Sequence, residues 1–284
     1  MQVAFVIIMF VVGTVMGSFL CCSARRLRQK ELGQKKSLGR RSVCMHCRKK
    51  LRWYENIPIF SWVFLGGKCS KCGKKIGVAE ILAEFGMGVA FVMTYFGFKN
   101  SLCGVGGEQL FENDVLGICG TVPLDYAVFG MILLFVLIAG FLAIYDGLYG
   151  ELPSLCLTFL AICAIIIAIL KQWSLVLVGQ WTPESLGGVM GAVMVLGGVY
   201  LLLYAISRGK WVGDGDWILA GAIGLVLGSA WLALVALCVA NLVACLVMLP
   251  TVIKNKKHTI YFGPFLVIAF VVVFAFAEML KSLI

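Results

Sequence analysis

Four cysteines in the first third of the chain have the spacing of a metal site. Cys44 and Cys47 form one Cys-x-x-Cys pair, and after 21 residues Cys69 and Cys72 form a second. Thiolates are ligands that Zn²⁺ prefers, and two such pairs can close a tetrahedral shell with no open position for catalysis. The spacing therefore predicts a structural Zn²⁺ site, with bound iron or redox-active thiols as the alternatives.

Two aspartates lie beside apolar runs, where a carboxylate is costly and is a functional candidate. Asp146 ends the run Ala143-Ile-Tyr-Asp146, and Asp216 ends Gly213-Asp-Gly-Asp216, whose glycines would let the backbone leave a helix. Two carboxylates from separate helices could share one proton, so that one activates water while the other polarises a carbonyl. This is aspartic protease chemistry; a loop-facing acid and a polar turn between helices are the structural alternatives.

The composition indicates which elements must position these residues. The chain has 284 residues, of which 61% are hydrophobic and 13% charged, far below the roughly 25% charge of soluble domains. A helix that crosses a bilayer needs about 20 mostly apolar residues. The sequence predicts such spans near residues 3–20, 79–98, 125–145, 152–170, 185–206, 216–228, 230–249 and 261–279. The expected fold is an all-α polytopic membrane protein with about eight transmembrane helices.

The positive charge of the chain sets an orientation for these spans. A formal charge of +10 would suggest nucleic acid in a soluble protein, but the basic residues here flank the apolar runs. If the N-terminus lies outside, 21 of the 24 Lys and Arg residues fall on the inner side, sixteen of them from Arg25 to Lys75. We therefore expect a cytoplasmic basic loop, contacts with membrane lipids and no nucleic-acid partner.

The pattern divides the chain into three parts: a first transmembrane helix over 1–23, a cytoplasmic zinc-binding domain over 24–78 and a transmembrane bundle over 79–284. The middle part has little apolar core, so metal binding would supply its folding energy. On the opposite side of the membrane, Cys103 and Cys119 could form a disulfide or remain two thiols, because sequence does not give their separation in space.

Several motifs along the chain resemble those of the type IV prepilin peptidase family. They are Gly17-Ser-Phe-Leu20, Ser42-Val-Cys44-Met-His-Cys47, Leu51-Arg-Trp-Tyr54-Glu-Asn56-Ile-Pro58, Gly67-Lys68-Cys69, Asp146 with Leu152-Pro153, Gly213-Asp-Gly-Asp216 and Tyr261-Phe-Gly-Pro264-Phe. The sequence differs from the family pattern at Cys21, where an Asn is common, and at Trp217-Ile218, where a Lys is usual. Glu84 matches a family Glu, whereas Glu80 replaces an aromatic residue. The structural alternative for both glutamates is an ion pair with an arginine of the basic loop.

This resemblance implies an intramembrane aspartic protease of the Gly-x-Gly-Asp type with Asp146 and Asp216 as its catalytic pair. The implied substrates are precursors of pilins or pseudopilins of a type IV pilus or type II secretion system. Their basic leaders would be cut at the cytoplasmic face of the inner membrane, and the new N-terminus would be methylated with S-adenosylmethionine. No methyl-donor site can be assigned from the motifs. A non-catalytic, zinc-braced membrane scaffold or transporter is the alternative from another class.

Overall fold

The computed structural model describes residues 2–33, 42–44, 46–47, 49–103, 123–177, 179–209, 212–255 and 261–283. Within these ranges the chain is helical, and its only β-structure is two isolated bridges. The chain separates into two compact units, one of residues 3–92 and one of residues 93–284 with the first two residues. Cys119 and the side chain of Cys103 lie outside the described part, and so does the bridge considered for them.

The first unit contains α1 (Gln2–Glu31), a 3₁₀ turn (Trp53–Asn56), α2 (Phe60–Phe64) and the beginning of α3 (Val78–Cys103). Helices α1 and α3 approach each other closely because α1 presents glycines at this contact. A Cβ atom at Gly13 would lie 2.6 Å from the Met87 carbonyl oxygen, and one at Gly17 would overlap the Ala83 carbonyl oxygen. Small residues at such spacing are typical of helix pairs in membranes, where close packing replaces the hydrophobic effect.

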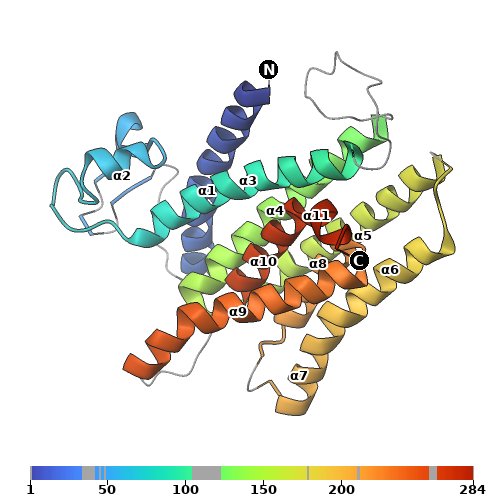
Figure 1. The fold of residues 1–284 in the computed structure, drawn as a ribbon. Helices are drawn as coiled ribbons and strands as arrows, with labels where there is room; N and C mark the ends of the chain where they lie inside the picture. The colour runs from blue at the N-terminus through green and yellow to red at the C-terminus, as the bar shows by residue number, and fades with distance from the viewer. Residues whose placement is uncertain are drawn as a thin grey trace. The chain divides into compact units, whose positions relative to one another are not determined.

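The second unit is a bundle of helices (Figure 1). Its elements are α4 (Pro123–Tyr149), α5 (Ser154–Leu177), α6 (Pro183–Val193), a π-helical segment (Met194–Gly198), α7 (Val199–Ser207), α8 (Asp216–Leu227), α9 (Ala230–Asn255), α10 (Gly263–Ala275) and α11 (Ala277–Lys281). Helix α8 packs against α5, α6, the π-helical segment and α10, and α10 also packs against α4 and α9. The short helices α8 and α10 therefore form the centre of the bundle.

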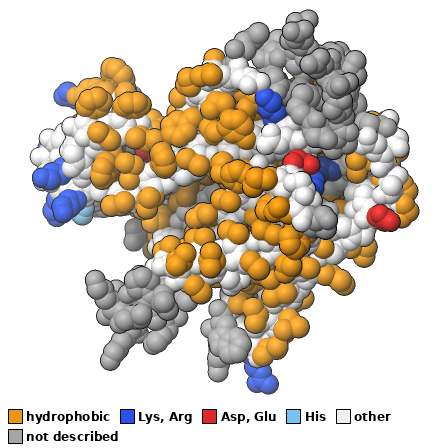
Figure 2. Space-filling model, in the orientation of Figure 1, with side chains coloured by type: hydrophobic (Ala, Val, Ile, Leu, Met, Phe, Trp, Pro, Cys, Tyr) orange, Lys and Arg blue, Asp and Glu red, His pale blue; other side chains and the backbone are white. Residues whose placement is uncertain are grey.

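Small residues let the neighbours of α8 approach it. The Cα atom of Gly221 would lie 2.9 Å from a Cβ at Gly197, in the π-helical segment, and the Ala192 carbonyl oxygen would lie 2.7 Å from a Cβ at Gly224. The faces of the helices that point away from the bundle carry large apolar side chains, for example Leu155 and Met194, which are exposed. Figure 2 shows hydrophobic side chains over most of the visible helical surface. Such a surface is compatible with lipid and not with water.

The expectation of an all-α membrane fold is confirmed. Among the described residues, six helices are long and apolar enough to cross a membrane, and α8 and α10 are shorter apolar helices. The run 261–279, expected as one span, is instead two helices, because the backbone turns out of helical geometry at Phe276. With 12 residues, α8 is about 18 Å long, which is shorter than the hydrocarbon core of a bilayer. Asp216 is the first residue of this helix.

Candidate functional site

The four predicted cysteines form one cluster in the first unit. Their Sγ atoms all lie within 4.8 Å of one another, and the Cys44–Cys72 and Cys47–Cys69 pairs are both 3.9 Å apart. Four sulfurs at about 2.3 Å from a tetrahedral Zn²⁺ would be separated by about 3.8 Å. The donor set and its spacing therefore fit a metal ion. His46, by contrast, is exposed and is not part of the cluster.

The two Cys-x-x-Cys turns are built alike. The backbone N–H of Cys44 donates to the carbonyl of Lys49, and that of Cys69 donates to the carbonyl of Lys74, each over 2.9 Å. One antiparallel bridge flanks each turn. The backbone N–H groups of Cys72 and then Lys71 lower the pKa of the Cys69 thiol to about 6, so these groups favour the thiolate form of Cys69. We call residues 42–76, which contain both turns, the tetracysteine lobe.

Glu55 is a buried carboxylate that joins distant parts of the tetracysteine lobe. It accepts hydrogen bonds from the Arg52 backbone N–H and the Lys49 ammonium, both over 2.8 Å, and from the Ser70 hydroxyl. These bonds, with the Arg52 N–H first, lower the pKa of Glu55 to about 2. Glu55 thus stays ionised and links the residues after the first cysteine pair to the second pair.

Two glutamates of α3 have different partners. Glu80 forms an ion pair with Arg25, whose guanidinium lies 2.5 Å from the Glu80 carboxylate. Glu84 is buried and accepts a hydrogen bond of 2.7 Å from the backbone N–H of Ile59, so the expected ion pair with an arginine is wrong for Glu84. Ile59 has a φ of 62°, which is unfavourable for a β-branched residue. Glu84 therefore holds a strained turn before α2 in place.

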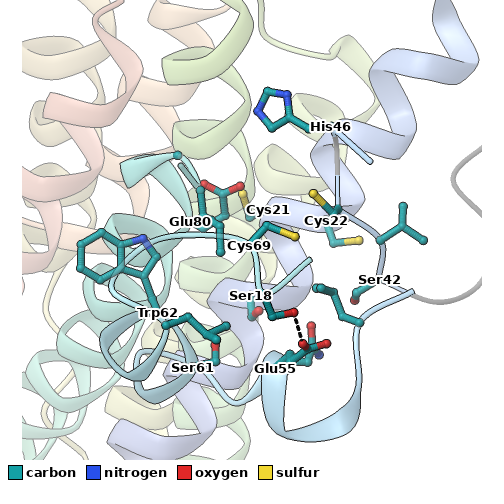
Figure 3. A pocket seen from close by; sticks show the side chains of 18 of the residues that line it. Ser18, Cys21, Cys22, Ser42, His46, Glu55, Ser61, Trp62, Cys69 and Glu80 are labelled. Carbon is teal, nitrogen blue, oxygen red and sulfur yellow. Dashed lines mark hydrogen bonds between the residues drawn. The ribbon is translucent and has the colours of Figure 1, made fainter. Parts of the chain in front are cut away.

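A cavity of about 430 Å³ lies between α1, α3 and the tetracysteine lobe, all within the first unit. Figure 3 shows Cys21 and Cys22 of α1 on its wall together with Trp62 and Glu80. Two polar atoms on this wall, Glu80 Oε2 and Trp62 Nε1, are buried and have no hydrogen-bond partner among the described residues. Glu80 Oε2 is an acceptor and Trp62 Nε1 is a donor. A small molecule in the cavity could therefore form a hydrogen bond with each of them.

The second unit holds Asp146, which is buried near the end of α4. Its Oδ2 atom accepts a hydrogen bond of 3.0 Å from the backbone N–H of Gly263, the first residue of α10. A Cβ atom at Gly263 would lie 2.8 Å from the same oxygen. The glycine in the Tyr261-Phe-Gly-Pro264 motif is therefore required for the close approach of this backbone to Asp146.

Asp216 is buried at the first position of α8, whereas Asp214 is exposed. The backbone N–H of Gly213 donates to Asp216 Oδ2 over 3.0 Å. A Cβ atom at Gly215 would lie 2.8 Å from Cδ1 of Leu152. Residues 213–215 lie outside a helix, as expected, although neither glycine has a positive φ angle. Both are small because a carboxylate or a neighbouring side chain lies against them.

The bundle brings Asp146 and Asp216 together from opposite ends of a 70-residue stretch, close enough for their charges to repel each other. Helix α10 packs on both α4 and α8 and positions the pair. Tyr200 of α7 was not predicted from the sequence, yet its buried phenol lies close enough to Asp216 for an electrostatic interaction. The Asn241 amide reaches the Tyr200 hydroxyl over 3.5 Å, and the ring of Phe262 lies 5.3 Å from that of Tyr200.

No spacing pattern in the sequence could have indicated Tyr200, because it is one polar side chain within an apolar span. The one feature of the sequence that could have drawn attention to Tyr200 is its polar hydroxyl group inside an apolar membrane span.

The chain is similar to known proteins over part or most of its length. The family model of the bacterial peptidase A24 N-terminal domain matches residues 11–98. A prepilin leader peptidase/N-methyltransferase of Dichelobacter nodosus is 28% identical over 228 residues, which are 80% of this chain and 68% of that protein. The protein of the same name from Pseudomonas aeruginosa is 25% identical over 94% of this chain and 88% of its own length. No solved structure matches the chain significantly.

A third relative of that name, from Myxococcus xanthus, is 41% identical over 88 residues, and this chain spans 25% of its length. The fold and the two clusters define a polytopic membrane protein that has a metal-binding tetracysteine lobe and a pair of buried aspartates. Within that class, the chain is similar to prepilin leader peptidases/N-methyltransferases, and its residues 11–98 match the N-terminal domain of the bacterial A24 peptidases.

Proposed function

We propose that this chain removes the leader peptide of type IV prepilins or pseudopilins with Asp146 and Asp216 as its catalytic pair. The observation that supports this most is the convergence of two buried aspartates in a chain whose relatives are prepilin peptidases. A buried acid pair inside an apolar bundle is costly and contributes nothing to packing, which favours a catalytic role.

In the proposed mechanism, the ionised aspartate accepts a proton from a water molecule, which attacks the scissile carbonyl carbon. The protonated aspartate donates its proton to the carbonyl oxygen. The first aspartate then gives its proton to the leaving nitrogen as the C–N bond breaks, and the second takes back the proton of the hydroxyl group that becomes the new carboxyl carbonyl. The N–H of Gly263 and the N–H of Gly213 orient the two carboxylates. We assign the Tyr200 hydroxyl a supporting role, as a hydrogen-bond donor to Asp216 or to the developing oxyanion.

We assign Zn²⁺ to the tetracysteine lobe as a structural ion held by Cys44, Cys47, Cys69 and Cys72. The four-sulfur shell leaves no position for water, so hydrolysis would rest on the aspartates alone.

We further propose that the chain methylates the new N-terminus with S-adenosylmethionine, as the names of its relatives suggest. The cavity of the first unit fits this donor: Glu80 Oε2 would accept from its ammonium group, and Trp62 Nε1 would donate to its carboxylate or adenine. Bound there, the molecule would supply a methyl group. In a binding titration with S-adenosylmethionine, E80Q and W62F should weaken binding about tenfold. K71Q, an exposed change outside the cavity, should leave it unchanged.

The basic loop and the active site are proposed to lie on the cytoplasmic side of the inner membrane, where lipids surround the bundle. A cysteine introduced in the loop should react with a membrane-permeant maleimide and resist an impermeant one in intact cells.

A gel-shift assay of purified prepilin with the detergent-solubilised chain tests the proposed activity. Leader removal, confirmed by sequencing the new N-terminus, is the expected result. Intact prepilin after prolonged incubation with several prepilins would contradict it and favour the zinc-braced scaffold or transporter.

A further inference from the structure

A second cavity, of about 370 Å³, lies in the helical bundle and is separate from the aspartate pair. Its wall includes Asp125, at the beginning of α4, whereas Asp146 is near the end of the same helix. The two aspartates are 21 positions apart, which corresponds to about 31 Å of α-helix, roughly the thickness of the hydrocarbon core of a bilayer. This cavity therefore opens at the other end of the bundle.

Two charges line this cavity without forming an ion pair with each other. Asp125 is only 4% exposed, and among the described residues its carboxylate accepts one hydrogen bond, of 2.9 Å, from the Ser174 hydroxyl. The Lys171 ammonium donates to the Val226 carbonyl over 2.7 Å and lies 5.5 Å from the centre of the Phe274 ring. Among the described residues no carboxylate lies within 4.0 Å of Lys171.

Leaving a carboxylate and an ammonium apart in an apolar bundle is unfavourable unless a ligand compensates both charges. A ligand that does so must itself carry an ammonium and an anion. Lys281, whose ammonium binds Glu278 over 2.8 Å, also lines the cavity and adds a second cation near Lys171. Two cations close together favour a phosphate over a carboxylate as the anion.

Much of the remaining wall is apolar, although it also includes the polar residues Ser101, Gln172, Gln180 and Ser185. The apolar residues include Phe98, Val128, Leu175, Leu232 and Phe274. We propose that this cavity binds the phosphoethanolamine head group of a membrane phospholipid. Its primary ammonium donates to Asp125, its phosphate accepts from Lys171 and Lys281, and its glycerol and acyl chains lie along the apolar wall.

Native mass spectrometry of the purified chain with lipid mixtures tests this proposal. Phosphatidylethanolamine should be retained about tenfold more than phosphatidylcholine, whose quaternary ammonium has no N–H to donate, and more than phosphatidylglycerol, which has no cation. D125N should lose this preference, whereas K171M should weaken the retention of all three lipids because each carries the phosphate. K30M, a change at an exposed lysine of α1, should alter neither.

Equal retention of the three lipids by the wild-type chain would overturn the proposal without any variant. So would an undiminished preference in folded D125N, with folding verified by its circular dichroism spectrum. Soluble glycerophosphoethanolamine separates the two sources of the head group. If it displaces the lipid at equimolar concentration, the lipid assignment is wrong; if it competes only at a large excess, the acyl chains contribute as proposed.

Discussion

In the tetracysteine lobe the outermost thiols, Cys44 and Cys72, are 28 positions apart, and local backbone hydrogen bonds hold each Cys-x-x-Cys turn. In the helical bundle Asp146 and Asp216 are 70 residues apart, and packing of α10 on α4 and α8 brings them together. The lobe has few buried apolar side chains, whereas the bundle has many, among them Leu219, Ile223 and Phe270. Local ligands thus hold the first site, and close packing holds the second, so different changes should break them.

Metal removal should give the largest effect and should be confined to the lobe. Structural Zn²⁺ in small domains contributes about 10 kcal/mol or more to folding, so a chelator or the pair C69S/C72S should remove amide exchange protection from residues 49–76. Hydrogen exchange with mass spectrometry measures this, and α4 to α10 should stay protected. C238S, at an exposed cysteine of α9, is the matched control. Protection of the lobe that survives chelation would show that the metal does not hold it.

G263A should be the most damaging change in the bundle short of removing an aspartate. A methyl group at this position would lie 2.8 Å from Asp146 Oδ2 and would displace the carboxylate or its N–H donor. Displacement by about 1 Å typically costs about 100-fold in rate, and we expect that loss in the prepilin gel shift. G130A, in the middle of α4 with nothing near the new methyl group, should cleave normally. Equal rates for both variants would remove the Gly263 contact from the account.

E55Q should loosen the tetracysteine lobe by about 1–3 kcal/mol, because the buried amide cannot satisfy all three donors. The effect should depend on pH. Glu55 has a pKa of about 2 in the folded chain and 4.5 ordinarily, so its contribution is complete above pH 4.5 and is lost as pH falls toward 2. Exchange rates of wild type and E55Q should therefore converge over that window. If the exchange rates of wild type and E55Q still differ at pH 2, the claim that Glu55 acts as an ionised carboxylate is wrong. The control is E184Q, at an exposed residue of α6, whose exchange rates in the lobe should equal those of wild type at every pH.

Y200F should have the smallest effect, about tenfold on cleavage, since one hydroxyl near Asp216 is lost and the ring contact with Phe262 remains. The matched change is Y204F, one turn further along α7. Both variants are compared in the gel shift under single-turnover conditions. A Y200F rate equal to that of Y204F would restrict Tyr200 to packing.

The contrast between the two regions also explains what the sequence could predict. The proximity of the four cysteines follows from the Cys-x-x-Cys spacing, because a tetrahedral metal shell restricts local geometry. Glu55 and Glu84 do not follow from it: both bind backbone N–H groups, Arg52 and Ile59, whose positions depend on the folded lobe.

For the bundle, hydropathy predicts most helices, but it cannot predict the break at Phe276 or the π-helical segment beside α8, which depend on packing. The aspartates were predicted from their motifs, and their proximity was not calculable from spacing. The same limit hid the reason for Gly263 and the placement of Tyr200, since both depend on which helices pack together.

The most direct test of the catalytic pair is the prepilin gel shift with D146N, D216N and D214N. We expect wild type to cleave the prepilin, and D214N as well, because Asp214 is exposed. The cleavage rate of D146N and of D216N should fall at least about 1,000-fold. Near-normal cleavage by either D146N or D216N, with its helical content intact, would contradict the two-aspartate mechanism.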